Sequence, residues 1–188
     1  MLPHLKEGTH RINAEAGEPG TYQIIKDGKM SVVMLRSAGY NLPIVVFPRK
    51  SHEREFVEAA KGVAKYGPVT ENPGAVGTLL LKKENTSTYG LEFIQSHYMT
   101  KGNPSLKDPK YGITRNRATQ YHGWRLRALR AALSAAQEEG KTVRVPKEAY
   151  IKKPGLLADI NKACREAGMG AYEGADGLTI LPPDSPSL

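Results

Sequence analysis

The feature that most constrains the fold is a long helical pattern set between β-type segments. Across residues 118–139, leucines and alanines recur every three or four positions, and Gly140 follows where helices commonly end. Leu126, Leu129, Leu133 and Ala136 fall on one stripe. A helix of this kind must bury its apolar stripe against another layer, and we expect that layer to be a sheet that contains residues 91–99.

The remaining segments alternate between strand and helix signals. The turn Asp27-Gly28 between two β-rich runs predicts a hairpin, and Pro154 and Gly168 bracket a second helical pattern. In chain order we expect a hairpin over 21–35, a buried strand over 41–48, a helix over 51–64, antiparallel strands over 76–83 and 89–99, the helix 118–139, a strand over 142–145, a helix over 154–168 and two short strands over 171–181. These elements predict an α/β (α+β) fold with a mixed, largely antiparallel sheet and helices on its faces.

The length of 188 residues indicates one domain rather than two. Residues 1–20 carry scattered glycines and charges without a period, so we interpret them as an N-terminal arm. We place the single α/β domain at 21–181 and a C-terminal tail at 182–188. Hydrophobic residues make up 39% of the chain, which is enough for a buried core.

Cysteine content and the length of the apolar runs indicate the cellular compartment of the protein. The single cysteine, Cys164, excludes an internal disulfide, and we expect a packed, inert thiol on the second helix. The longest apolar runs are strand-sized, so we expect no membrane segment and a cytoplasmic protein, or a virion-associated one if the chain comes from a phage. His52 and Glu53 lack a second histidine at helical spacing, and no metal site is expected.

Positive charge is concentrated in one segment. The net charge is +8 and the pI about 9.5, which favours anionic partners. Between residues 101 and 130, eight Lys and Arg residues stand against Asp108 as the only acid. Because this segment includes a long loop ahead of the main helix, it is the strongest candidate for a ligand site.

The turn that opens the main helix has the chemistry of a phosphate site. Unpaired backbone N–H groups and the positive end of the helix dipole lie at a helix start, and Gly123 would let a ligand approach the backbone. Gln120 and Arg125 flank this glycine, and Arg115 and Arg117 precede it. We expect Gly123→Val to remove ligand binding at little cost to the fold. The alternative is an incidental glycine beside solvated arginines.

On Gln120, Gly123 and Arg125, the chain resembles the GCN5-related N-acetyltransferase family. That family holds the acyl-CoA pyrophosphate on a Gln/Arg-x-x-Gly-x-Gly/Ala turn at the start of its central helix, and Arg125 departs from the last position. The resemblance extends by topology over about half the chain, from residue 91 to the closing strands. It implies an acyl-CoA N-acyltransferase-like fold, acetyl-CoA as cofactor, Glu92 as the base and a tyrosine acid, for which Tyr150 is the candidate.

Two further interpretations use the same region. A nucleic-acid surface would use cations for phosphates and aromatic rings for bases, without an accompanying recognition motif. Its candidate residues are Lys101, Lys107, Lys110, Arg127, Arg130, Tyr121 and Trp124. Residues 93–97 together with Trp124 also resemble a module of large polyvalent proteins of phages. The alternative function is therefore a non-enzymatic accessory protein that binds DNA or RNA, or a virion structural protein.

Overall fold

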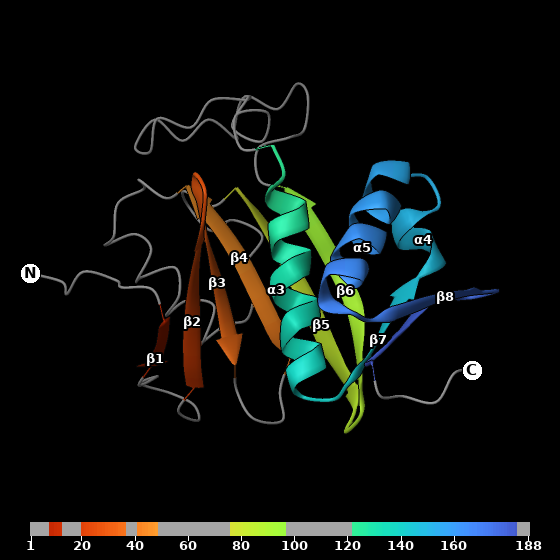
Figure 1. Cartoon of the computed structure of the whole chain (residues 1–188), viewed down its shortest axis with the longest axis horizontal. Coiled ribbons are helices and arrows are strands. Elements are labelled where there is room, and N and C mark those ends of the chain that lie inside the picture. The colour runs from red at the N-terminus through yellow and green to blue at the C-terminus, as the bar shows by residue number, and fades with distance from the viewer. Residues whose placement is uncertain (1–7, 13–19, 37–40, 49–75, 97–121, 184–188) are drawn as a thin grey trace, which may run out of the picture.

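A computed structural model describes residues 8–12, 20–36, 41–48, 76–96 and 122–183. In these ranges the chain forms a mixed α+β fold with one mostly antiparallel sheet (Figure 1). The sheet has nine strands in the order β1-β2-β3-β4-β5-β6-β7-β9-β8. Its strands are β1 (Gly8–Ile12), β2 (Gly20–Asp27), β3 (Met30–Arg36), β4 (Leu42–Pro48), β5 (Gly77–Asn85), β6 (Thr88–Ser96), β7 (Thr142–Pro146), β8 (Gly170–Gly174) and β9 (Gly177–Leu181).

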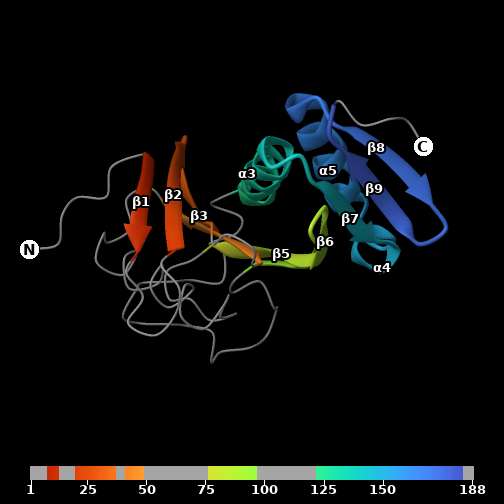
Figure 2. The same cartoon turned by 90° about the horizontal axis from the view of Figure 1, so that it is seen from below.

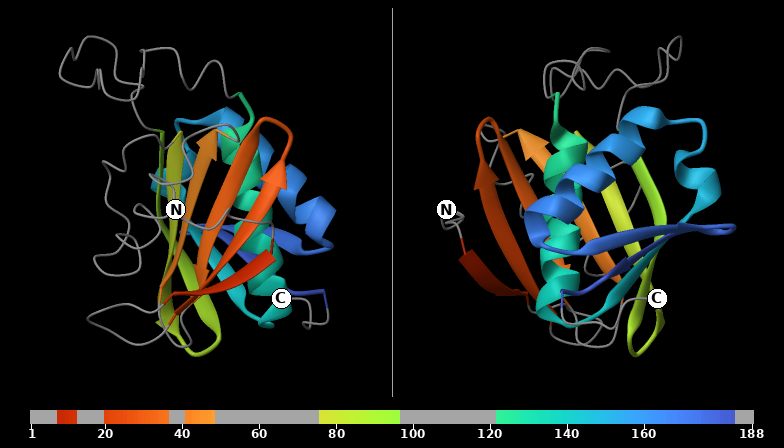
Figure 3. Two further views of the ribbon diagram at one scale, coloured as in Figure 1. Left: turned by 90° about the vertical axis from the view of Figure 1, so that its left-hand side faces the viewer. Right: turned by 45° about the vertical axis from the view of Figure 1, so that its right-hand side comes forward.

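Within the described residues, three helices follow β6. These are α3 (Trp124–Glu138), the single turn α4 (Lys147–Tyr150) and α5 (Pro154–Ala167). The long helices α3 and α5 contact each other and lie on the same face of the sheet (Figure 2). Helix α3 crosses β3, β4 and β5, whereas α5 reaches β8. The right-hand view of Figure 3 shows the two helices side by side in front of the strands.

The apolar stripe of α3 is buried in the core, as the sequence predicted. Leu129 and Leu133 are buried and Leu126 is partly buried against the same cluster. Small alanines on either side let the helix approach the sheet and α5 closely. Each fully buried leucine contributes about 1.5–3 kcal/mol relative to an exposed one, which makes this stripe a major stabilising element.

The strands β3 and β4 are buried on both faces. Val32 and Ile44 face α3 within the central cluster, whereas Val33, Val45 and Phe47 are buried although they lie outside that cluster. This confirms the interpretation of the continuous apolar run as a buried strand. The hairpin of β2 and β3 is also confirmed, with a two-residue turn in which Gly28 has a φ of +60°.

Helix α3 begins later than the sequence indicated. The expected start at residue 118 is wrong for residues 122 and 123, which form a turn before Trp124. Gly123 has a φ of +87°, a left-handed conformation that an α-helix does not contain. Helical periodicity alone could not show this, because the spacing of apolar residues does not report the φ of a glycine. Residues 118–121 lie outside the described ranges.

The other elements agree with the sequence in part. The strands β5 and β6 pair antiparallel, and α5 ends at Gly168, whose φ is +68°. The strand β1 was not predicted, because its five residues lack alternation, yet it pairs with β2 along its length. The short helix α4 was not predicted either. The expected helix over 51–64 lies outside the described residues.

One junction in the sheet differs from the rest. The strands β6 and β7 are the parallel pair, and their register covers only Thr88–Gly90 with Thr142–Arg144. The strand β6 continues to Ser96, so its second half has no partner in β7. In Figure 1 the two strands separate towards the end of the sheet where α3 and α5 begin.

Candidate ligand-binding cavity

A cavity of about 480 Å³ occupies this junction. Its described walls are residues 94–96 at the end of β6, Trp124 and Arg125 at the start of α3, and Lys153 and Leu156 at the start of α5. The size lies within the usual range for small-molecule sites. Apolar side chains and two cations meet in one cavity, which suits an elongated ligand with an anionic part.

The indole of Trp124 forms one wall of the cavity and packs against Gly77 of β5. Trp124 is 7% exposed and belongs to the central core cluster. A methyl group added at Gly77 on β5 would lie 2.5 Å from two carbons of the indole ring. The ring therefore rests directly on the backbone of β5. The sequence interpretation of Trp124 as a base-stacking residue did not anticipate this burial.

Arg125 lies across the start of α5. Its Nε donates a hydrogen bond of 2.8 Å to Oδ2 of Asp159, and both side chains are about one-third exposed. A methyl group added at Gly155 would lie 3.0 Å from Nη2 of Arg125. The absence of a side chain at Gly155 gives the guanidinium room beside the first turn of α5. The pair with Asp159 thus fixes a cation at the cavity wall.

Lys153 is the second cation of the cavity. It occupies the N-cap position of α5, and within the described part of the chain its ammonium group makes no ion pair or hydrogen bond. Neither α3 nor α5 has a side-chain cap or an acidic residue in its first turn. Two helix starts and two cationic side chains therefore create a positive potential at the cavity.

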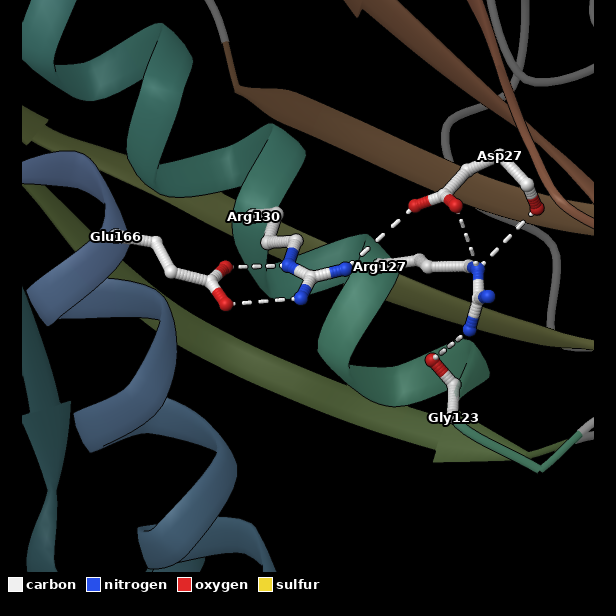
Figure 4. A network of polar contacts seen from close by, with 5 residues as sticks. All are labelled: Asp27, Gly123, Arg127, Arg130 and Glu166. Atoms are coloured by element: carbon white, nitrogen blue, oxygen red, sulfur yellow. Dashed lines mark hydrogen bonds and ion pairs between the residues drawn. The ribbon is translucent and has the colours of Figure 1, made fainter.

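The other two described arginines of α3 are engaged in a separate network (Figure 4). Arg130 donates two hydrogen bonds to the carboxylate of Glu166, with 2.8 Å between Nη2 and Oε1, and its Nη1 lies 3.6 Å from Oδ2 of Asp27. Arg127 donates to the carbonyl oxygens of Asp27 and Gly123, each at 3.2 Å. These contacts join α3 to α5 and to the hairpin turn.

The network shifts the titration of its members. The hydrogen bond to Arg130 lowers the pKa of the Glu166 carboxyl, and the same bond raises the pKa of Arg130. Elsewhere, burial raises the pKa of the Cys164 thiol to about 11. Cys164 is 2% exposed, which confirms the expected packed thiol. A thiol of this kind is protonated at neutral pH and poorly nucleophilic.

The two residues proposed for catalysis lie apart from the described cavity walls. Glu92 is exposed on β6 at a register shift, where Leu80 pairs with Phe93 but Leu81 pairs with Leu91. It is thus the extra residue of a bulge, a feature that redirects side chains. Tyr150 is buried and its hydroxyl donates to Glu173 at 3.3 Å. Burial is the main cause that raises the pKa of Tyr150.

The other predicted site residues fall into two groups: those after Gly123 are described by the structure, and those before it are not. Trp124 and Arg125 line the cavity, whereas Arg127 and Arg130 form the network in Figure 4. The residues predicted on the loop and at the end of it lie outside the described ranges. They are Lys101, Lys107, Lys110, Arg115, Arg117, Gln120 and Tyr121.

The expectation that Gly123→Val would cost the fold little is wrong. The φ of +87° is strained for any L side chain, and a methyl group there would lie 2.8 Å from Nη1 of Arg127. A valine at this position would disturb the start of α3 itself. Loss of binding in that variant could not be separated from loss of structure.

The sequence did not identify Lys153, Asp159 or the two glycines that accommodate the cavity side chains. Lys153 had one signal, its position directly before the proline that opens a helix. Asp159 had none, because its partner Arg125 is 34 residues away and on another helix. The roles of Gly77 and Gly155 are visible only in the structure, where the side chains of Trp124 and Arg125 pack against them.

Other kinds of site have no support in the described ranges. There, no three His, Cys, Asp or Glu side chains form a cluster that could hold a metal ion. None of the helices in these ranges has the length and hydropathy of a membrane span. A scan against protein-family models and searches of curated proteins and solved structures found no match.

Proposed function

We propose that the cavity at the start of α3 binds an acyl-CoA or a similar phosphate-bearing ligand, in an acetyltransferase-like domain. The observation that carries the proposal is the cavity at the separating pair β6 and β7, where two cations and two helix starts meet apolar walls. Phosphate groups suit the cations and the backbone N–H groups. A thin pantetheine arm suits the space beside Ile94, Trp124 and Leu156.

The resemblance to the GCN5-related N-acetyltransferases supports the same ligand. It covers the succession of β6, α3, β7, α5, β8 and β9, which surrounds the cavity. In that family the turn before the central helix holds the acyl-CoA pyrophosphate, and here Gly123 and Arg125 stand at this turn. The ligand chemistry inferred from the cavity and the ligand implied by the resemblance therefore coincide.

Acyl transfer requires an amine to attack the thioester carbonyl, with loss of its proton and departure of the thiolate. Glu92 is the proposed base, because it is exposed on the strand that ends at the cavity. Tyr150 hydrogen-bonds Glu173 and does not line the described cavity, so the proposal gives it no proton-transfer role.

The binding test uses thermal stability and the fluorescence of Trp124, the only tryptophan in the chain. A ligand at about a hundred times its Kd stabilises the folded state by about 2.7 kcal/mol, which raises Tm by roughly 5–10 °C for a chain of this size. Because Trp124 lines the cavity, CoA bound there should also change its emission. A CoA or acetyl-CoA titration without either effect would refute the proposal.

An oligonucleotide titration serves as the competing measurement. Arg127 and Arg130 are held by carboxylates and carbonyl oxygens, so they are not free to neutralise phosphates along a nucleic acid. We therefore expect weak oligonucleotide binding without a change in Trp124 emission. Tight binding that falls steeply with salt, together with no response to CoA, would favour the accessory-protein function instead.

A further inference from the structure

We propose that the phosphate group of the ligand is bound between the starts of α3 and α5, by the side chains of Arg125 and Lys153. This inference rests on the proposed function and deepens it. It assigns the anion to two side chains from different helices, in addition to the backbone of the turn before α3. The ligand class is an organic phosphate whose apolar arm extends towards Ile94 and Leu156.

The placement of Arg125 is the first argument. Its guanidinium lies beside the first turn of α5, where the positive helix end disfavours a cation. The single carboxylate of Asp159 offsets this repulsion through Nε, at 2.8 Å. Within the described residues the Nη donors of Arg125 make no hydrogen bond, so they are available to an anion in the cavity. An arginine can present two such donors to one phosphate.

Lys153 is the second argument. It lines the same cavity from the N-cap position of α5, and its ammonium is free among the described residues. The two cations and the two uncapped helix starts outweigh the one carboxylate of Asp159. Positive charges gathered in this way repel one another unless an anion lies between them. A phosphate group would pair with both side chains and with the N–H groups at the start of α3, whereas at the start of α5 Pro154 has no N–H and the N–H groups of Leu156 and Leu157 already bond the carbonyl oxygen of Lys153.

The test compares Arg125→Gln and Lys153→Met with the control Lys152→Met. Lys152 is exposed and adjacent in sequence but does not line the cavity, so its variant removes the same charge outside the site. Each variant is titrated with CoA and with pantetheine, which lacks the phosphates, and Trp124 emission is the readout. We expect each cavity variant to weaken CoA binding roughly tenfold or more, since a charge-assisted hydrogen bond is lost. The control should bind CoA within about twofold of the wild type, at the scale of a screened surface charge.

Ligand and salt dependence separate the possible failures. If the wild type binds neither CoA nor acetyl-CoA, the proposed function itself fails. If it binds CoA while Lys153→Met and Arg125→Gln behave as the control does, or if pantetheine binds as tightly as CoA, only the inference about the phosphate is overturned. Should Arg125→Gln melt at a markedly lower temperature, Lys153→Met decides alone, because the exposed Lys153 side chain has no hydrogen-bond or ion-pair partner among the described residues.

Discussion

The contact between Gly77 and Trp124 allows a quantitative test of how the cavity wall is built. In Gly77→Ala the new methyl group would lie 2.5 Å from two indole carbons, a distance at which atoms overlap. The indole is rigid and 7% exposed, so it cannot rotate away without disturbing the core. Overpacking of this kind costs about 1–3 kcal/mol of unfolding free energy.

The expected loss of unfolding free energy in Gly77→Ala depends on the presence of the indole, and a double-mutant cycle measures that dependence. Trp124→Ala alone should lower the unfolding free energy by about 3–5 kcal/mol. In that background Gly77→Ala has no ring to displace, and it should stabilise the protein by about 0.4–1 kcal/mol by restricting the unfolded chain. The two changes are therefore coupled by about 1.4–4 kcal/mol.

Urea unfolding followed by far-UV circular dichroism provides the free energies, since the signal does not need the tryptophan. If Trp124→Ala leaves too little stability to measure, Trp124→Leu removes the same ring carbons and keeps more apolar contact. The reasoning is refuted if Gly77→Ala costs the same with and without the indole. That result would mean that Trp124 does not rest on β5, and the cavity wall would need another description.

Three further outcomes test other parts of the structure. Gly177→Ala should destabilise the protein strongly, because Gly177 has a φ of +140° and an added methyl group would overlap a carbonyl oxygen of β7. The control Gly174→Ala should be nearly neutral, since the nearest atom to an added methyl group there lies at 3.9 Å. Equal melting temperatures of the two variants would contradict this expectation. Glu166 has a pKa lowered by Arg130, so its contribution is present above the ordinary carboxyl pKa of about 4.3 and is lost as the pH falls through the lower folded-state value. The Tm difference between the wild type and Glu166→Gln should therefore shrink in acid, and a difference that grows instead would be inconsistent with the pair. Cys164 should react with a thiol reagent at pH 8 far more slowly in the folded protein than in urea, because its pKa is about 11; equal rates would show an accessible thiol.

The parts of the fold that the sequence predicted are those with local causes. The leucine stripe of α3, the Asp27-Gly28 turn and the closing Gly168 each act within a few residues of their own position. Hydrophobic spacing and turn chemistry therefore located most strands and both long helices. The strand β1 escaped because an edge strand of five residues is defined by its partner β2 rather than by its own pattern.

The candidate site was predictable only where it depends on the start of one helix. The sequence located Arg125 at the opening of α3 but not the side chain that orients it, because Asp159 comes from another helix. Arg127 and Arg130 were interpreted as a free basic surface, yet they lie within reach of Asp27 and Glu166 once the hairpin and α5 pack against α3. A sequence gives the number of cationic residues but does not show which of them are paired with carboxylates in the fold.

The left-handed turn at Gly123 sets both where α3 begins and which residues stand at its start beside the cavity. Periodicity extended the helix back to residue 118, but Gly123 ends the helical path and makes Trp124 the first residue of α3. The first residues of the helix are thereby the ones that line the cavity, and their N–H groups have no side-chain cap. Arg125 and Arg127 are two residues apart and therefore lie on opposite faces of α3, so that Arg125 lines the cavity while Arg127 donates to the carbonyl oxygen of Gly123. The position at which Gly123 starts the helix thus sets which face of α3 each arginine occupies, and only Arg125 faces the proposed ligand site.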